Sequence, residues 1–288
     1  MKLVLGTANL NQKYGILRES TTKKESIKIL KYTIKNLKFI DTASAYEGFN
    51  KLAKKIDLSK IKINTKIFNI EGDTYKKIYQ NISKDLNFFL NLYKIKKINN
   101  LFLHKPKEIL NKKKGLFLIK ALKKLKKEKI IKCIGYSVYE PSEIKVLIKK
   151  FEPDIIQGPI SFFDQRMIKS GILNILKKKK IKFQARSIFL QGILLDRNII
   201  NHYKFFKDNH IFIKWFNWLE KNNLDPVKVL IQFIQSYKNQ IDSVIFSAKT
   251  LSQLKQCHAY FKKNDSTTFP KMKKINEKII DPRKWKNN

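Results

Sequence analysis

Short apolar runs alternate with amphipathic stretches along the whole sequence. The apolar runs cover residues 2–6, 38–42, 61–67, 98–103, 131–137, 154–158, 181–187 and 241–247. Each has the length of a buried strand and is bounded by turn-forming or charged residues. The pattern therefore predicts eight strands.

The stretches between these runs carry apolar residues at helical spacing. In one of them, Ile144, Leu147, Ile148 and Phe151 follow the order i, i+3, i+4, i+7 of a one-sided helix. Comparable apolar faces occur in 27–37, 118–125, 168–175 and 227–234. Such alternation is typical of parallel βαβ units, and eight of them suit a closed barrel. We expect an α/β fold, a (β/α)8 TIM barrel with outer helices, as a single domain over residues 1–288.

Two segments depart from the even spacing. Residues 203–222 predict an additional amphipathic helix, whose aromatic side chains fall at helical spacing and should pack rather than stack on nucleic-acid bases. The C-terminal tail, 265–288, is expected to be a loop, a short helix over 271–279 and the segment IDPRKW.

The chain is strongly basic. Its formal net charge is +39, from 62 Lys and Arg against 23 Asp and Glu, and only five of the basic residues are arginine. Such a charge could bind polyanions through their phosphates, but the readout of bases depends largely on arginine. The lysines lie on the polar faces of nearly every expected helix, which indicates a compositional bias on solvated surfaces. A polyanion-binding protein would instead gather its lysines on one face, and it stays an alternative.

Several other classes of protein find little support. No apolar run reaches the 18 residues of a membrane span, and the N-terminus MKLVLGTANL turns polar too early for a signal peptide. Cys133 and Cys257 are the only cysteines and form no CxxC motif, so neither disulfides nor a metal site are expected. We expect a cytoplasmic, soluble protein without a bound metal.

Four residues whose side chains could take part in catalysis lie at or near the ends of three successive apolar runs. Asp41 directly follows the apolar start of FIDTASAY (39–46) and Tyr46 ends this segment, Lys66 lies near the end of INTKIF (63–68), and His104 follows NNLFL. In a parallel barrel these ends lie on the one rim where active sites are built. Each residue alone has an ordinary structural explanation, but the joint placement favours catalysis.

The four residue types suit the reduction of a carbonyl group. The unperturbed pKa of a phenol is about 10, so Tyr46 would need a nearby cation to act as an acid near neutral pH. Lys66 could supply that cation, with Asp41 holding it charged and oriented. His104 could donate a hydrogen bond to the carbonyl oxygen.

These residues, in this order, resemble the catalytic tetrad of the aldo-keto reductases. The resemblance runs in order along nearly the whole chain, through LGTANLNQKYGI (5–16), FIDTASAY (39–46), CIGYSVYEP (133–141), IIQGPISFFDQR (155–166), ARSIFLQGIL (185–194), SVIFSAKTLSQL (243–254) and IDPRKW. It implies that Tyr46 is the general acid, that Lys66 and Asp41 tune it, and that His104 orients the substrate.

The resemblance also implies a nicotinamide cofactor site. Ser137 and Gln157 match positions that bind the nicotinamide carboxamide, and Arg186 stands where many members have a tyrosine that stacks on the nicotinamide. The pyrophosphate and the adenosine ribose would be bound by Ser187, Gln191, Gly192, Ala248, Lys249, Thr250 and Gln253. Lys249 offers a charge to a ribose 2′-phosphate, and the segment 247–254 contains no carboxylate, so NADPH is expected rather than NADH.

The resemblance thus implies an NAD(P)H-dependent oxidoreductase that reduces an aldehyde or ketone to an alcohol. Segments such as IIQGPISFFDQR are most similar to bacterial members associated with surface-sugar synthesis, which favours a sugar-derived carbonyl as substrate. A cofactor-binding barrel that serves as a non-catalytic regulatory or scaffold subunit is the alternative, because channel-associated relatives show that the fold can serve so. The oligomeric state is not predicted.

Overall fold

Eight parallel strands form a closed barrel in the computed structural model of the chain, which describes residues 1–16, 18–203, 206, 209–263, 268–270 and 275–285. The strands follow one another in chain order, and the last pairs with the first. They are β1 Lys2–Gly6, β2 Phe39–Asp41, β3 Lys62–Ile67, β4 Ile98–Leu103, β5 Ile131–Ser137, β6 Ile155–Pro159, β7 Lys182–Arg186 and β8 Ser243–Phe246. All eight predicted strands and the predicted TIM barrel are confirmed.

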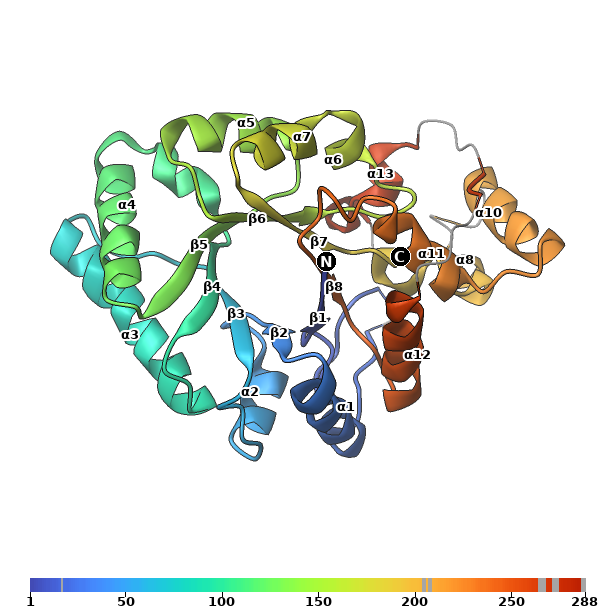
Figure 1. The fold of residues 1–288 in the computed structure, drawn as a ribbon, viewed down its shortest axis with the longest axis horizontal. Helices are drawn as coiled ribbons and strands as arrows, with labels where there is room; N and C mark the ends of the chain where they lie inside the picture. The colour runs from blue at the N-terminus through green and yellow to red at the C-terminus, as the bar shows by residue number, and fades with distance from the viewer. Residues whose placement is uncertain (17, 204–205, 207–208, 264–267, 271–274, 286–288) are drawn as a thin grey trace.

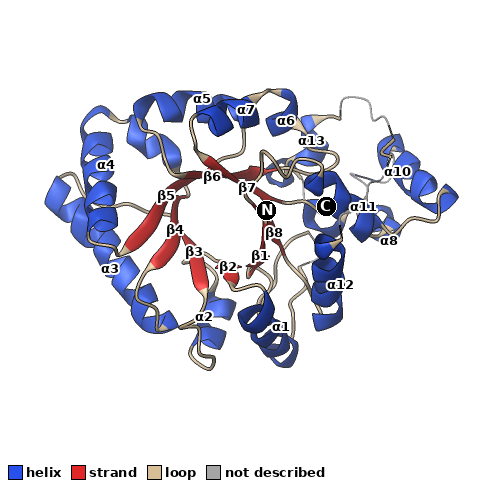
Figure 2. Ribbon diagram, in the orientation of Figure 1, coloured by secondary structure: helices blue, strands red, loops and turns tan. Residues whose placement is uncertain are grey.

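Helices surround the ring of strands on the outside (Figures 1 and 2). The described helices are α1 Lys23–Asn36, α2 Glu47–Ala53, α3 Tyr75–Tyr93, α4 Lys112–Lys127, α5 Pro141–Lys150, α6 Arg166–Lys169, α7 Ile172–Lys178, α8 Arg197–His202, α10 His210–Lys221, α11 Pro226–Gln235, α12 Leu251–Lys262 and α13 Glu277–Ile280. Short 3₁₀ turns are η1 Pro106–Leu110, η2 Leu190–Gly192 and η3 Pro282–Lys284. The apolar faces of the helices pack against the outside of the barrel.

Three expected helices differ from the structure. The face over 168–175 is split into α6 and α7, because Gly171 between them has a left-handed backbone (φ 70°). Of the helix expected over 203–222, Tyr203 is extended at the end of α8, residues 204, 205, 207 and 208 lie outside the described part, and α10 begins at His210 after its cap Asn209. Of the helix expected over 271–279, residues 271–274 lie outside the described part, and α13 begins at Glu277.

The aromatic residues of the additional helix pack as expected. Trp215 is fully buried, its indole N–H donates to the carbonyl of Leu194 at 3.0 Å, and its ring lies 5.0 Å from that of Phe162. Phe206 contacts Trp285 of the C-terminal segment, with ring centroids 5.1 Å apart. The described part of the tail is thereby attached to the β6 side of the barrel.

No helix in the described ranges combines the length and the apolar character that a bilayer crossing would need. Nor do the described histidines, cysteines and acidic residues form a group of three or more that could bind a metal ion.

Candidate active site

The residues predicted to be catalytic meet at one cavity of about 600 Å³. Asp41 is the last residue of β2, Lys66 is the penultimate residue of β3, and His104 directly follows β4. Tyr46 lies in the position preceding α2. Four elements thus bring these side chains to the wall of a single cavity at the carboxyl ends of the strands.

Asp41 and Lys66 form a buried ion pair. The Lys66 ammonium donates to one carboxylate oxygen of Asp41 and to the carbonyl of Thr42 at 3.4 Å. Burial lowers the pKa of Lys66, and the neighbouring Asp41 carboxylate opposes that shift. The pair keeps both charges inside the barrel, but each charge largely cancels the field of the other.

The second carboxylate oxygen of Asp41 is held from across the barrel. Gln157 of β6 donates its amide N–H to that oxygen at 2.8 Å and also to Oε1 of Gln184 on β7 at 2.8 Å. Gln184 in turn donates to Ser243 Oγ of β8 at 3.0 Å. Because a carboxylate only accepts hydrogen bonds, the amide of Gln157 must present its nitrogen to Asp41. Its Oε1 is buried and has no partner among the described residues.

Tyr46 is partly buried, and its hydroxyl makes no hydrogen bond within the described part of the chain. Burial raises the pKa of this phenol, and Tyr14, Asp41 and Tyr139 act in the same direction. The cation that opposes them is Arg186. The phenol therefore stays protonated in the free protein and can serve as a proton donor. Lys66, which the sequence predicts to lower the pKa of Tyr46, is not among the main groups that shift it in the free protein.

A close approach of two loops fixes the backbone next to Tyr46. The N–H of Gly48, in the first turn of α2, donates to Gln12 Oε1 at 2.7 Å. A Cβ at Gly48 would lie 2.5 Å from the carbonyl oxygen of Leu10, so any other residue would push the loop before α1 away. The glycine in this turn therefore sets where Tyr46 sits.

His104 is neutral over most of the pH range. Burial lowers its pKa to about 4, and the cations Lys66, Arg186 and Lys105 add to the shift. Its ring packs on Phe68 with the centroids 4.0 Å apart, and Nδ1 is buried without a partner among the described residues. A neutral imidazole can donate one hydrogen bond to a carbonyl oxygen.

Most of the predicted cofactor-binding residues line the same cavity. Ser137, Gln157, Arg186, Ser187, Gln191, Gly192, Lys249 and Gln253 lie on its wall. Ala248 and Thr250 do not: Ala248 is buried and its carbonyl accepts from Asn9 at 2.9 Å, whereas the Thr250 hydroxyl caps α12. The structure therefore does not place these two predicted residues on the cavity wall.

The loop after β7 is tied to the loop before α1. Gln191, expected near a pyrophosphate, accepts at Oε1 from the N–H of Ile16 at 2.9 Å. The hydroxyl of Tyr203 donates to the carbonyl of Ile16 at 2.8 Å. Both Gln191 and Ile16 line the cavity, so these bonds join two segments of its wall.

Carboxylates from elsewhere in the chain reach the segment that was expected to bind the ribose. Glu19 forms an ion pair with Lys249, and Glu25 accepts from the N–H of Leu251 at 2.6 Å at the start of α12. Glu19 is about half exposed and lines the cavity. Residues 247–254 themselves contain no carboxylate. In the folded protein the carboxylates of Glu19 and Glu25 reach this segment, so the expectation of a ribose site without a carboxylate is wrong.

The comparisons with known proteins fit this geometry. The model of the Aldo/keto reductase family matches residues 2–278. The chain belongs to the aldo/keto reductase family. It is thus a member of a family of oxidoreductases that act on small carbonyl compounds. None of the curated proteins matches the sequence.

Solved structures of the family share the fold at low identity. An aldo-keto reductase from Bacillus halodurans, in its holo form, is 16% identical with a TM-score of 0.69, covering 93% of this chain and 88% of that one. A glycerol dehydrogenase from Gluconobacter oxydans is 18% identical with a TM-score of 0.66, covering 92% and 87%. An aldo-keto reductase from a Medee basin deep-sea metagenome library is 16% identical with a TM-score of 0.61, covering 98% and 89%. At these identities the likeness establishes the fold only.

We predict that the His104 ring titrates near pH 4 and not near its ordinary pKa of about 6.5. Burial and the cations around the imidazole disfavour its charged form, so protonation is delayed as the pH falls. NMR titration of the ring signals, assigned with a His104→Gln variant, measures this. Lys66→Met should raise the pKa because one of the opposing cations is removed. A midpoint near 6.5 in the parent would contradict the described environment.

Proposed function

We propose that the protein is an NAD(P)H-dependent reductase that converts an aldehyde or ketone to an alcohol, with Tyr46 as general acid. The observation that carries the proposal is the meeting of Tyr46, His104 and the Asp41–Lys66 pair at one cavity. The burial of the phenol keeps it protonated until a neighbouring oxygen gains negative charge.

The residues have separate tasks. His104 donates a hydrogen bond to the substrate carbonyl and orients it between the proton donor and the cofactor. Tyr46 transfers its proton to the carbonyl oxygen. Lys66, held charged and oriented by Asp41, is the residue that the family resemblance assigns to tuning Tyr46, and its ammonium is neutralised by the Asp41 carboxylate in the free protein.

The cavity suits a nicotinamide cofactor, which supplies the hydride when bound. The fit rests on Gln157, whose Oε1 is buried, has no described partner and can only accept a hydrogen bond. The amide N–H of a nicotinamide carboxamide would satisfy it, with Ser137 beside it on β5. Ser187, Gln191 and Gly192 would face the pyrophosphate, and Lys249 and Gln253 the adenosine ribose.

We further propose a preference for NADPH, carried by Lys249 on the cavity wall. Glu19 limits how much more tightly NADPH binds than NADH, because it competes with a 2′-phosphate for the Lys249 ammonium. The Glu25 carboxylate accepts a hydrogen bond from the first N–H of α12. The N-terminus of this helix therefore has fewer free N–H groups for binding an anion than its sequence indicates.

The substrate that the sequence favours is a sugar-derived carbonyl, and a cytoplasmic location likewise stays a prediction. We propose that residues 1–288 act as one domain, with the tail 265–288 as a part of it.

We predict that Tyr46→Phe lowers kcat by about 100- to 10,000-fold, the usual contribution of a positioned acid, and leaves cofactor affinity nearly unchanged. Only the transferable proton is lost, because the ring remains. Steady-state kinetics and a fluorescence titration with NADPH measure the two quantities. Tyr32→Phe, on the outer helix α1, is the matched control. Retention of more than half of the parent kcat would exclude Tyr46 as the acid.

We predict that Lys249→Ala and Glu19→Gln shift cofactor preference in opposite directions. Loss of the ammonium removes a charge-assisted hydrogen bond, a contribution of about 1.5–3 kcal/mol, and should weaken NADPH about tenfold or more while hardly affecting NADH. Loss of the carboxylate frees Lys249 and should strengthen NADPH binding. Dissociation constants for both cofactors decide this. Equal affinity of the parent for NADPH and NADH, or unchanged NADPH affinity in Lys249→Ala, would contradict the preference for NADPH.

A further inference from the structure

Among the described residues, Arg186 is a cation on the cavity wall without an ion-pair partner, whereas Asp196, a carboxylate on the same wall, caps the start of α8. Arg186 ends β7 and lines the cavity with Tyr46 and His104. No carboxylate in the described part of the chain forms an ion pair with its guanidinium. Three other arginines are paired with acids: Arg166, Arg197 and Arg283.

The partners of Arg186 are neutral groups that hold it in place. Its Nη2 donates to the carbonyl of Val138 at 3.1 Å, and Nη1 lies 3.4 Å from Ser187 Oγ. Its Cζ lies 4.2 Å from the centroid of the Tyr139 ring. These contacts orient the guanidinium but leave its charge unneutralised.

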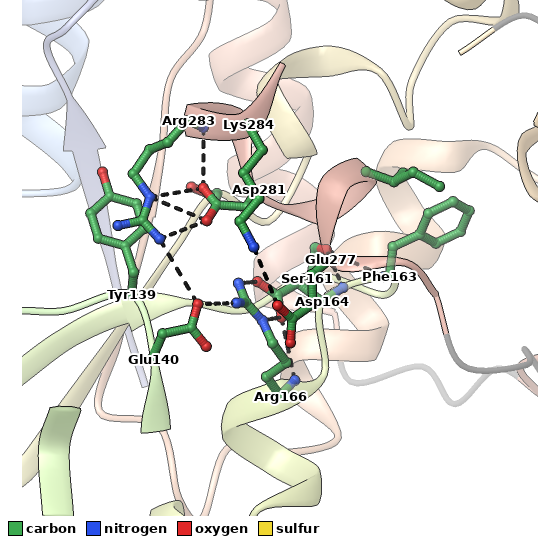
Figure 3. A network of polar contacts seen from close by, with 12 residues as sticks. Tyr139, Glu140, Ser161, Phe163, Asp164, Arg166, Glu277, Asp281, Arg283 and Lys284 are labelled. Carbon is green, nitrogen blue, oxygen red and sulfur yellow. Dashed lines mark hydrogen bonds and ion pairs between the residues drawn. The ribbon is translucent and has the colours of Figure 1, made fainter. Parts of the chain in front are cut away.

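The ring of Tyr139 is braced by the C-terminal segment (Figure 3). The Arg283 guanidinium lies 3.6 Å from the ring centroid, and Asp281 accepts from Arg283 at 2.6 Å. Glu140, next to Tyr139, pairs with Arg166 and lies 3.8 Å from Arg283. The network connects the loop after β5 to the C-terminal tail. It thereby holds in place the Tyr139 ring on which the Arg186 guanidinium packs.

Lys66 cannot supply the same net charge. Its ammonium is in direct contact with the Asp41 carboxylate, and an ion pair in contact has a far weaker field at a distance than a single charge has. The acidic and phenolic groups that act on Tyr46 are Tyr14, Asp41 and Tyr139, and the cation among the groups that act on it is Arg186. For His104 the facing charges are Lys66, Arg186 and Lys105.

We propose that Arg186 belongs to the reaction centre: its unpaired guanidinium, held on the Tyr139 ring, supplies the net positive charge that stabilises the oxygen that becomes negative during reduction. The inference rests on the proposed function. The reduced nicotinamide would supply a hydride and be oxidised. As the hydride adds to the carbonyl carbon, the π pair of the C=O bond moves to the oxygen, and that oxygen takes the proton of Tyr46. The phenolate left behind is reprotonated from water, and Arg186 stabilises the negative charge through each of these stages.

The test compares Arg186→Met with Arg186→Lys. The methionine removes the charge, so it should lower kcat about tenfold or more and move the pH profile of kcat to higher pH, since one unit of pKa is a tenfold change in the proton equilibrium. Lysine should recover part of the loss. Arg197→Met removes the same charge from a side chain of α8 that does not line the cavity, and should leave kcat unchanged.

A second readout needs no turnover. In the free protein, the NMR-derived pKa of His104 should rise in Arg186→Met, and less in Arg186→Lys, because a facing cation is lost. An unchanged His104 pKa in Arg186→Met would overturn the inference, as would a kcat above half of the parent value. If the parent reduces no carbonyl at all, the proposed function fails, and the His104 pKa still decides whether the Arg186 charge acts at the site.

The bracing is tested at Tyr139. Tyr139→Leu removes the ring and should shift both the pH profile and the His104 pKa in the direction of Arg186→Met, whereas Tyr139→Phe keeps the ring and should retain more activity than the leucine variant. Identical behaviour of the leucine and phenylalanine variants would show that the ring does not position Arg186.

Discussion

The buried ion pair between Asp41 and Lys66 is the interaction on which the site depends. An ammonium inside a barrel loses its hydration, and the effective penalty is several kcal/mol per ion unless a counter-charge and further hydrogen bonds replace the water. Asp41 supplies the counter-charge, Thr42 supplies a carbonyl, and Gln157 satisfies the second carboxylate oxygen. Asp41 and Lys66 lie on the neighbouring strands β2 and β3, whereas Gln157 on β6 can reach the pair only when the barrel closes.

The same pair explains how charge is distributed around the cavity. The opposite charges of the pair partly cancel, and Arg186, which has no acidic partner among the described residues, acts on His104 together with Lys66. Arg186 provides the positive charge, the neutral His104 can donate without adding charge, and the buried phenol keeps its proton. The part of the cavity wall around Tyr46 therefore combines a proton donor, a hydrogen-bond donor and the positive charge of Arg186, which suits an oxygen that becomes negative.

Much of this site could be predicted from the sequence because its residues coincide with the ends of apolar runs. A strand that stops at Asp41, Lys66 or His104 must place that residue on the barrel rim, whatever the rest of the chain does. Gln184 was missed although a signal existed: it is an amide inside the apolar run 181–187, two positions before Arg186 and thus on the same face. By contrast, the partners Glu19 and Glu25 lie 230 and 226 residues from Lys249 and Leu251, and no local pattern reveals such contacts. The helix expected over 168–175 is divided into two short helices at Gly171. The spacing of apolar residues alone does not reveal this break.

The central claim is that the described cavity performs carbonyl reduction and is more than a binding site for a cofactor. The most direct measurement is the oxidation of NADPH by the purified protein with a panel of sugar aldehydes and ketones, followed by the loss of the absorbance of the reduced nicotinamide. The account predicts carbonyl-dependent oxidation, with one alcohol formed for each NADPH consumed. Tight NADPH binding without any carbonyl-dependent oxidation across the panel would contradict it and would favour the regulatory or scaffold role.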